Sequence, residues 1–532
     1  LAGMFEAAGW HTVMVKYGAR LRDQPGLRAR IDAMPNEEYQ RLLRADAGEL
    51  RERLELDTSG LGDADLLATF RDLGGHDLAA LLEGYAKADA VRDRPSVVFA
   101  YTIKGWTLPT EGHPANHSAL LNDEQFAALG ERLGEDPGAP FARFDPSTAE
   151  GELCAAAARR LRREPPRPAA PPPVPADVGR EHTGRVSTQQ AFGRLLSDLA
   201  REAPEVADRV VTVSPDVGTS TNLGGWINRA GIWALGDRID WFADDTDTLV
   251  RWRETDHGRH IELGIAEVNL VGLLGELGAT WSRDGQPLLP IGTIYDPFVA
   301  RALEPWSFGI YAGGQSILVG TPSGVTLGPE GGAHQSVITP SIGVEQPGCV
   351  AWEPAFGQDL EWCLLHALSR LGRPDGTSAY FRLSTRPLDQ SLHRASREEA
   401  LSGGYRLRAG ERVTIAVMGA LVPEAMAAAE ELDAEVVCIT SADLLFRSLQ
   451  ARAGLADGDP AAAERLFTPG RPIVTLLDGH PHTLAFLGAV HRVPVSCLGV
   501  TRFGQSGDLA ELYEHHQIDA ESVVGAALDL LS

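Results

Sequence analysis

A glutamate in an otherwise apolar stretch is the first candidate for chemistry. The run Leu263–Leu270 reads Leu-Gly-Ile-Ala-Glu-Val-Asn-Leu. On a helix over Gly264–Gly278, apolar side chains would occupy most of the circumference, so we expect a buried helix. Glu267 would then need a partner or a proton, because desolvation disfavours its charged form, and a protonated carboxyl can hydrogen-bond a ring nitrogen. A glutamate near the surface at the helix end, stabilised by the helix dipole, is the alternative that periodicity leaves open.

Two aromatic side chains follow a predicted strand at its carboxyl end. Tyr295 and Phe298, in the run Tyr-Asp-Pro-Phe, come directly after the strand expected over Leu288–Ile294. Aromatic faces at the exit of a strand can form a stacking platform for a flat ring. Two aromatics that only fill the core would give the same pattern, so both interpretations remain open.

One histidine belongs to a loop rich in glycine. The run Gly328–Ser336 reads Gly-Pro-Glu-Gly-Gly-Ala-His-Gln-Ser and contains His334. Such a loop can present a titratable group to a site. A surface histidine without a function is the alternative.

A lysine and two histidines lie on a second loop, after the strand expected over Ser96–Ile103. The run from Lys104 contains His113 and His117. Their spacing of four would suit a metal on a helix, but Pro114 disfavours a helix there and no acidic third ligand is evident. We therefore assign no metal ligand to this chain.

Composition and charge restrict the partners. The 532 residues include 73 Asp and Glu against 48 Lys and Arg, a formal charge of −25. A nucleic-acid binder needs a basic surface, so nucleic acid is not expected as a main partner. The apolar stretches are too short to span a bilayer, so no membrane is expected. The five cysteines form no Cys-x-x-Cys pair and fit reduced thiols in the cytoplasm.

The elements that must position these residues predict an α/β fold of three successive doubly wound parallel-sheet domains. Strands are expected at 12–15, 96–103, 210–213, 288–294, 315–320, 413–417, 435–440, 472–477 and 493–498. Helices are expected between them. Only two convincing strands precede residue 164, whereas a sheet normally has about five or six, so we expect the first domain to be incomplete.

A proline-rich segment separates the first domain from the rest. Seven prolines fall between Glu164 and Val178, a composition typical of an extended linker. We predict a first domain at residues 1–163, a linker at 164–180, a second domain at 181–395 and a third at 396–532. The third domain has no identifiable chemistry and is interpreted as an assembly element.

Together these segments resemble the homodimeric type of pyruvate dehydrogenase E1 component, a thiamine-diphosphate enzyme related to transketolase. The resemblance covers essentially the whole chain, in the order and near the spacing of the family. It rests on the segments Leu1–Trp10, Tyr101–Gly105, Gly264–Asn269, Thr321–Gly324 and Gly499–Gly504. The three domains would then be the carboxyl-terminal part of the diphosphate-binding domain, the pyrimidine-binding domain and the transketolase carboxyl-terminal-like domain. The loop around His334 departs from the usual E1 sequence and resembles transketolase instead.

The resemblance implies roles for the cofactor side of the site. Glu267 looks like the glutamate that hydrogen-bonds the aminopyrimidine ring of thiamine diphosphate and favours its imino tautomer. That tautomer accepts the proton of the thiazolium carbon, and the cofactor supplies the electron sink. Phe298 looks like the ring that packs on the aminopyrimidine, with Tyr295 beside it.

The resemblance also implies a substrate side. His334 and His117 look like catalytic histidines that stabilise the substrate adduct or move its protons. Lys104 and Asp216 look like further residues of the same cavity.

The metal side of the family's site is missing from this sequence. The family binds the cofactor's diphosphate through Mg²⁺, held by a Gly-Asp-Gly stretch and a later Asn, hard oxygen ligands of the kind Mg²⁺ needs. No Gly-Asp-Gly occurs in the chain. We therefore expect the metal ligands upstream of residue 1 or on another chain.

The expected function is oxidative decarboxylation of a 2-oxo acid, with pyruvate favoured, and transfer of the acyl unit to a lipoyl-bearing acyltransferase within a 2-oxo acid dehydrogenase complex. By analogy with the family we expect a homodimer. One alternative is a transketolase-like transfer of ketol units. Another is a non-catalytic remnant or complementing subunit, which is suggested by the absence of the metal-binding motif from the sequence.

Overall fold

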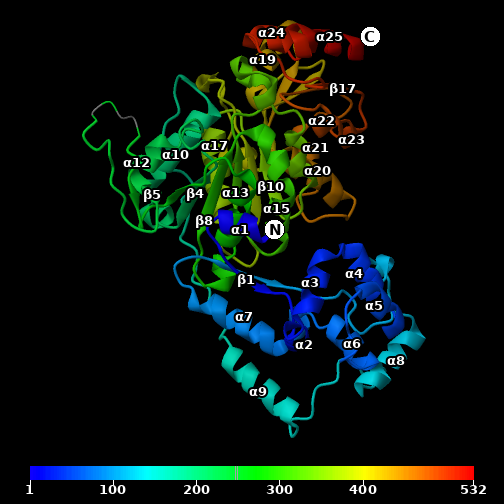
Figure 1. Cartoon of the computed structure of the whole chain (residues 1–532). Coiled ribbons are helices and arrows are strands. Elements are labelled where there is room, and N and C mark those ends of the chain that lie inside the picture. Colours follow the sequence, from blue (N-terminus) through cyan, green and yellow to red (C-terminus); the bar gives the residue numbers. More distant parts are fainter. Residues whose placement is uncertain (246, 248–249) are drawn as a thin grey trace. The chain divides into compact units, whose positions relative to one another are not determined.

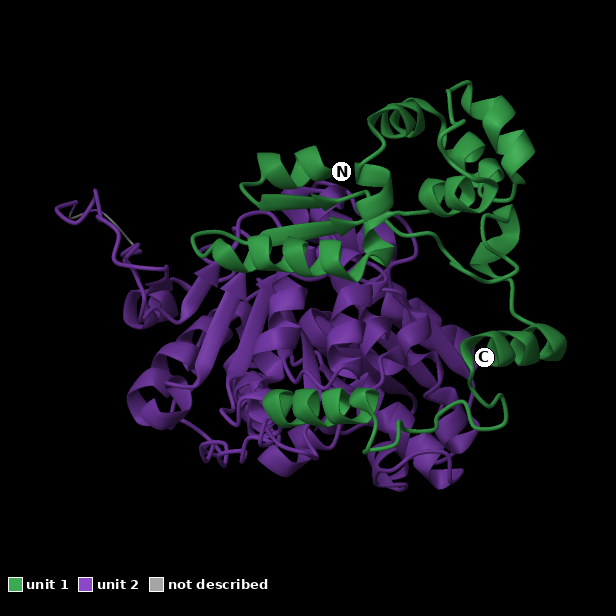
Figure 2. Cartoon of the chain, turned by 60° about the horizontal axis from the view of Figure 1, so that its bottom comes forward, with its two compact units in different colours: residues 1–162 green, residues 163–532 purple. Residues whose placement is uncertain are grey.

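The computed structural model describes residues 1–245, 247 and 250–532. It divides into two compact units, residues 1–162 and 163–532 (Figure 2). Residues 162–175, which hold most of the proline-rich segment, contain neither helix nor strand. Each unit is described by itself.

Unit 1 is mainly helical around a small parallel sheet (Figure 1). Its two described strands, β1 (His11–Val15) and β2 (Ser96–Ala100), pair in parallel, as the sequence predicted. Val13 and Val15 of β1 pack on Ala80 of a long helix. The helices are α1 (Ala2–Ala7), α2 (Ala19–Arg22), α3 (Pro25–Ala33), α4 (Asn36–Leu42), α5 (Ala47–Leu54), α6 (Asp63–Phe70), α7 (Leu78–Ala90), α8 (Asp123–Leu133) and α9 (Ala149–Leu161).

Unit 2 begins with an eight-stranded parallel sheet in the order β10-β11-β9-β8-β4-β7-β5-β6. Its strands are β4 (Val210–Ser214), β5 (Ile232–Trp233), β6 (Glu254–Thr255), β7 (His260–Glu262), β8 (Leu289–Ile294), β9 (Ile317–Gly320), β10 (Cys349–Trp352) and β11 (Ser378–Arg382). Because side chains alternate along a strand, Ile317 and Val319 pack with helices on one face while Leu318 packs with helices on the other. The sheet is therefore doubly wound.

Two pairs of helices cover the faces of this sheet. On one face lie α10 (Thr188–Glu202) and α17 (Gly357–Ser369). On the other lie α13 (Glu267–Gly278) and α15 (Val299–Tyr311), which approach so closely that a Cβ at Gly275 would lie 3.2 Å from Gly309 Cα.

A second, five-stranded sheet completes unit 2, in the order β13-β15-β14-β16-β17. Only β13 is antiparallel. The strands are β13 (Gly404–Arg408), β14 (Thr414–Met418), β15 (Glu435–Ile439), β16 (Ile473–Leu477) and β17 (Val495–Leu498). Ile415 and Val417 face one core, whereas Ala416 and Met418 face another, so this sheet too has helices on both sides.

The remaining elements are short or cover the second sheet. Two strands, β3 (Arg185–Val186) and β12 (Leu388–Asp389), form an antiparallel pair. The helices are α11 (Pro204–Ala207), α12 (Gly224–Ala230), α14 (Thr280–Arg283), α16 (Ile342–Glu345), α18 (Arg397–Leu401), α19 (Val422–Leu432), α20 (Ala442–Arg452), α21 (Ala462–Leu466), α22 (His482–Ala485), α23 (Gly488–His491), α24 (Leu509–His516) and α25 (Ala520–Leu531). No helix in the described residues is both long and apolar enough to cross a bilayer.

The predicted α/β class with parallel sheets is confirmed, and every predicted strand lies in a sheet. The prediction of a helix over Gly264–Gly278 that is buried all round was wrong in two respects. The helix begins at Glu267, because Gly264 takes a φ of +70°. Its outer side also remains exposed, with Val268 46 % accessible, because only one face of α13 packs on the sheet.

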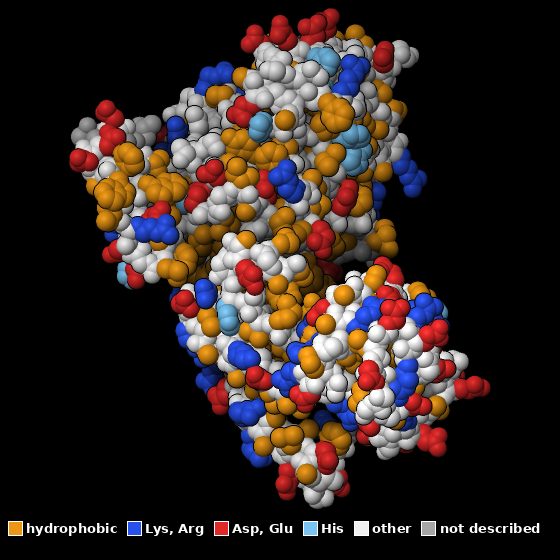
Figure 3. All heavy atoms as spheres, viewed as in Figure 1, with side chains coloured by type: hydrophobic (Ala, Val, Ile, Leu, Met, Phe, Trp, Pro, Cys, Tyr) orange, Lys and Arg blue, Asp and Glu red, His pale blue; other side chains and the backbone are white. Residues whose placement is uncertain are grey.

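The surface carries both signs of charge despite the acidic excess. On the face shown in Figure 3, basic and acidic side chains are interspersed among apolar ones. No broad basic area appears on that face.

Candidate functional site

Glu267 is the first residue of α13 and is 6 % exposed. It is thus both buried and at a helix end, so each of the two sequence interpretations is partly correct. Its Oε1 accepts a hydrogen bond from Arg301 Nη1 at 3.2 Å. The guanidinium is a cation and the N-terminus of a helix carries a partial positive charge, so both attract an acidic side chain at this position. In this structure Glu267 is therefore a paired carboxylate.

Arg301 connects this carboxylate to an aromatic ring. It lies in the first turn of α15, and its guanidinium carbon is 4.9 Å from the centroid of the Phe298 ring. The side chain is 55 % exposed, so it can leave that position at little cost. Sequence reasoning missed Arg301, although it follows Phe298 by three residues and so falls on the same side of the helix.

Three rings meet beside this pair. The Tyr295 and Phe298 rings are nearly parallel, 6° apart in plane with centroids 6.5 Å apart. His334 points its ring edge-on to both, with centroid distances of 5.9 and 6.0 Å. Its Nδ1 is buried and has no hydrogen-bond partner among the residues that the structure describes. A buried polar atom without a partner marks a position that a ligand or a water can satisfy.

The sheet explains why these residues converge. Tyr295 and Phe298 follow β8, and the His334 loop follows β9; these are neighbouring parallel strands. Glu267 follows β7, which pairs with β4 in the same sheet. The carboxyl ends of parallel strands share one edge, where ligands of open α/β sheets bind. The structure thus brings four of the predicted residues to one place.

The other predicted residues have no described contact with these four. Asp216 is exposed on the turn after β4, with a φ of +69°, and among the described residues no hydrogen bond or ion pair joins it to Glu267 or the three rings. Lys104 and His117 belong to unit 1, where Lys104 Nζ lies 2.8 Å from His117 Nδ1. Their placement in one cavity with Glu267 stays a prediction.

Metal binding finds no support in the part of the chain that the structure describes. There, no group of three or more His, Cys, Asp or Glu side chains is arranged to hold a metal ion. His113 Nδ1 accepts a hydrogen bond from Ala115 N at 3.0 Å and so caps the short 3-10 helix Pro114–His117. No α-helix forms there, which removes the spacing argument for a His113–His117 metal pair.

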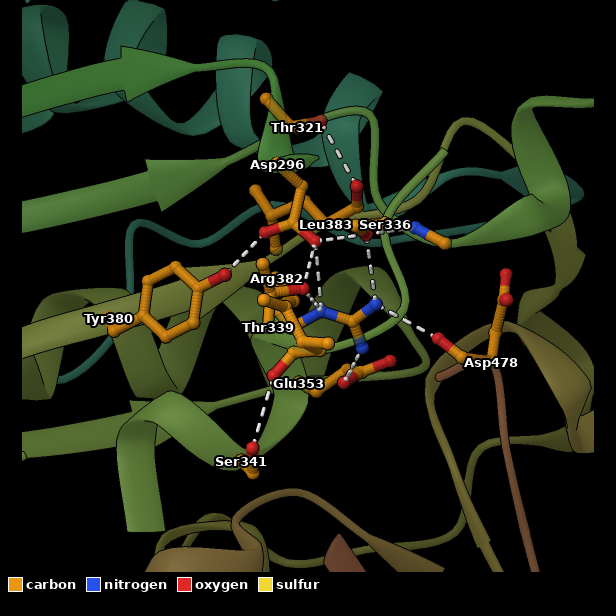
Figure 4. Close-up of polar contacts among 12 residues, drawn as sticks. Asp296, Thr321, Ser336, Thr339, Ser341, Glu353, Tyr380, Arg382, Leu383 and Asp478 are labelled. Carbon is orange, nitrogen blue, oxygen red and sulfur yellow. Dashed lines mark hydrogen bonds and ion pairs between the residues drawn. The ribbon is translucent and has the colours of Figure 1, made fainter. Parts of the chain in front are cut away.

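A buried polar cluster behind the rings was missed by sequence reasoning (Figure 4). At its centre lies Asp296, whose carboxylate is fully buried. Four side chains donate to it: Ser336 Oγ, Thr339 Oγ1, Tyr380 OH and Arg382 Nε. The signal in the sequence was an aspartate between the two aromatics and an arginine inside an apolar strand run.

Arg382 is the single cation among the carboxylates of this cluster. Its Nη1 donates to Glu353, and its Nη2 donates to the carbonyl of Asp478 at 2.9 Å. Burial raises the pKa of Glu353 to about 7, against the pull of Arg382. Burial also raises the pKa of Asp478. Three buried acids therefore share one guanidinium.

Comparisons with known proteins agree on the type of fold. Residues 174–385 match the family model of the pyruvate dehydrogenase E1 component middle domain. Residues 62–152 match the transketolase thiamine diphosphate binding domain. These matches fall in unit 2 and unit 1 respectively.

Curated relatives and solved structures extend the match. The pyruvate dehydrogenase E1 component of Mycobacterium tuberculosis is 24% identical over the whole chain, which spans 63% of that protein's length. The Escherichia coli K12 protein is 23% identical, with 65% of its length covered. The transketolase of Leishmania mexicana has 19% identity and a TM-score of 0.64 over 86% of this chain and 65% of that one. A transketolase variant from Pichia stipitis has 18% identity and the same TM-score over 100% and 68%.

The site and these matches point the same way. The chain carries the transketolase-like fold, and its sequence aligns from end to end with about two thirds of each E1 component. The chain is therefore a relative of the pyruvate dehydrogenase E1 components, a thiamine-diphosphate-dependent enzyme family with a transketolase-like fold.

Proposed function

We propose that this chain provides the aminopyrimidine side of a thiamine diphosphate site that decarboxylates a 2-oxo acid, with pyruvate as the substrate. The observation that carries the proposal is the position of Glu267. It is a nearly inaccessible carboxylate at a helix N-terminus, joined through Arg301 to Phe298 and so to the ring cluster. The unpartnered His334 Nδ1 lies beside both aromatic rings.

The residues present fit the pyrimidine part of the cofactor. Glu267 would hydrogen-bond a ring nitrogen, and Phe298 would pack on the ring face, with Tyr295 beside it. Thiamine diphosphate, when bound, supplies the ylid and the electron sink. His334 would hold or move a proton at Nδ1 on the substrate side. We propose that His117, Lys104 and Asp216 serve the same cavity.

Binding of the cofactor's ring would require Arg301 to move. Its guanidinium covers a face of Phe298 and pairs with Glu267. A flat ring that packs on that face has to displace it. Once Arg301 leaves, Glu267 loses its hydrogen-bond partner, and its carboxyl group becomes available to a ring nitrogen.

The metal side fits less well. The described residues offer no cluster for Mg²⁺, and a Mg²⁺–diphosphate site needs hard oxygen ligands. We therefore place the Mg²⁺ ligands outside residues 1–532, in a preceding segment or another chain. We also retain as proposals the domain limits 1–163, 164–180, 181–395 and 396–532, and a cytoplasmic location.

A homodimer and a lipoyl-bearing acyltransferase complete the proposal. Apolar side chains are exposed on the outer side of α13 and α15 and just before α13, including Ile265 at 79 % and Tyr311 at 87 %. Apolar exposure of this kind is typical of an interface between subunits. We propose the acyltransferase and membership of a 2-oxo acid dehydrogenase complex because the chain is related to the E1 components.

A transketolase-like transfer of ketol units is the second candidate. It is favoured by the loop Gly-Ala-His334-Gln-Ser and by the likeness of the fold to transketolases. Transfer from a sugar phosphate without reduction of lipoamide would select it. A non-catalytic complementing subunit is favoured by the lack of a metal cluster in the described residues.

Calorimetric titration with Mg²⁺ and thiamine diphosphate tests the proposal. We expect no micromolar binding by this chain, because the metal side is lacking, and micromolar binding would show that the site is misplaced. NMR signals of the histidine rings should nevertheless report weak binding, with the His334 signal moving.

Two variants and a control sharpen this titration. Glu267→Gln and Phe298→Ala should abolish the movement of the His334 signal. Glu276→Gln, on the exposed side of the same helix, should leave it intact. A signal that moves equally in all three variants would remove the role assigned to Glu267.

A further inference from the structure

The loop that carries His334 has little backbone structure of its own. Between β9 and α16 it contains only short 3-10 segments, such as Val325–Glu330 and Gly332–His334. Neither a sheet ladder nor an α-helix holds it in place over these described residues. Its conformation therefore depends on the side chains that bond to it.

One set of bonds comes from the second sheet. Asp478, just after β16, accepts from Val325 N at 2.8 Å and from Thr326 N at 3.0 Å. The Thr326 hydroxyl donates to the same carboxylate. Gly324 makes this contact possible, because it has a φ of +73° and a Cβ there would lie 2.1 Å from Asp478 Oδ2. The start of the His334 loop is thus fixed to the five-stranded sheet.

The other set comes from the first sheet. Ser336, two residues after His334, donates to Asp296 and accepts from Gly324 N at 2.8 Å. Asp296 itself lies between Tyr295 and Phe298 in the chain. One carboxylate therefore ties the histidine loop to the segment that carries the two aromatic rings.

Arg382 joins the carboxylate of Asp296 to the backbone of Asp478. It donates to Asp296 through Nε at 3.1 Å and to the carbonyl of Asp478 through Nη2. Figure 4 shows the guanidinium between residues of the two sheets. All three side chains are at most 3 % exposed. A buried network that is fully bonded has few alternative arrangements, so it fixes geometry as well as adding stability.

We propose that Asp296 and Asp478 are positioning residues, which hold the His334 loop against the Tyr295–Phe298 ring pair from two different sheets. The five-stranded sheet then helps to shape the site and is more than an assembly element. The arrangement keeps His334 Nδ1 beside the two rings, where the pyrimidine and the substrate would meet. This part of the inference rests on the proposed function.

The test reads the position of His334 directly in the full chain without cofactor. Histidine rings labelled at Cε1 give one NMR signal each, and His334→Gln identifies the signal of His334. Because two aromatic rings lie within 6.0 Å of it, that signal is sensitive to small movements. We expect Ser336→Ala, Asp478→Asn and Asp296→Asn to shift it toward the position of a solvent-exposed histidine.

A matched control separates positioning from stability. Asp198 is also buried and paired with two arginines of the same unit, Arg180 and Arg201, but among the described residues it has no bond to the loop. Asp198→Asn should lower the melting temperature without moving the His334 signal. The proposal is overturned if the signal stays in place in Ser336→Ala and Asp478→Asn, or if Asp198→Asn moves it as far. Ser336→Ala removes a single hydroxyl group. This variant therefore still tests the proposal if Asp296→Asn does not fold.

The two proposals can fail independently. The His334 signal is measured without thiamine diphosphate, so an unmoved signal contradicts the positioning role and leaves cofactor binding open. Conversely, absent cofactor binding in the titration leaves the measured position of His334 unaffected.

Discussion

Lys104 and His117 of unit 1 and the ring cluster of unit 2 present candidate chemistry in opposite ways. In unit 1, Lys104 and His117 are exposed and bond to each other on a loop. In unit 2, Glu267 is buried, and Asp296 fixes the segment between the two rings from behind. The difference teaches that a site needs buried bonds that fix its reactive groups as well as the groups themselves. In unit 2 these bonds are the ones to Asp296. In unit 1 the described contact of the Lys104 ammonium is with His117.

The largest effect is expected where that support is removed. Arg382→Met would leave the two buried carboxylates that pair with it, Asp296 and Glu353, without their cation, and we expect a loss of about 3–5 kcal/mol of unfolding free energy at neutral pH. Urea denaturation measures it. A loss below 1 kcal/mol would mean that the acids are already neutral, and the contrast between the two regions would weaken.

The pH dependence of the unfolding free energy should reveal the proton that Glu353 binds in the folded chain. Burial raises the pKa of Glu353 from 4.5 to about 7, so the folded chain binds more protons than the unfolded chain in that window. Stability should therefore fall as the pH rises from 4.5 to 7, by up to about 3 kcal/mol from this group. Glu353→Gln should flatten that part of the profile, and an unchanged slope would contradict the assignment.

A smaller effect is expected at the partner of Glu267. Arg301 is largely exposed, so Arg301→Met should change stability by less than about 1 kcal/mol. It should nevertheless strengthen aminopyrimidine binding, because the face of Phe298 is then free of the guanidinium. Titration followed through the His334 signal checks this, with Arg283→Met as a control for loss of an exposed, ion-paired arginine. Weaker binding would indicate that Arg301 is part of the ligand site.

The smallest effect is expected in unit 1. Lys104→Met removes an exposed side chain whose contact is with His117, and we expect a stability change within about 0.5 kcal/mol. Chemical denaturation measures it. A loss of several kcal/mol would show that this pair is as firmly built as the cluster of unit 2.

Local patterns predicted much of this structure. Apolar runs marked β4, β8 and β9 of the first large sheet and β14–β17 of the second, whereas the other strands of both sheets were missed. Tyr295, Phe298 and His334 were correctly placed after predicted strands. The start of α13 was missed by three residues, because Gly264 takes a φ of +70° that periodicity does not reveal. The exposure of Val268 was missed because composition around a helix does not say how many of its faces find a partner.

The sequence by itself determined the α/β class and the relationship to a thiamine-diphosphate enzyme family, and it left open whether Glu267 is buried. Only the tertiary structure decided that Arg301 pairs with Glu267 and that Asp296, Arg382 and Asp478 converge. Arg382 is 86 residues from Asp296 and 96 from Asp478 in the chain. Hydrogen bonds depend on distances of about 3 Å between atoms. No local pattern encodes such distances, because they arise only when the fold brings together strand ends that are far apart in the chain and, for Asp478, belong to a different sheet.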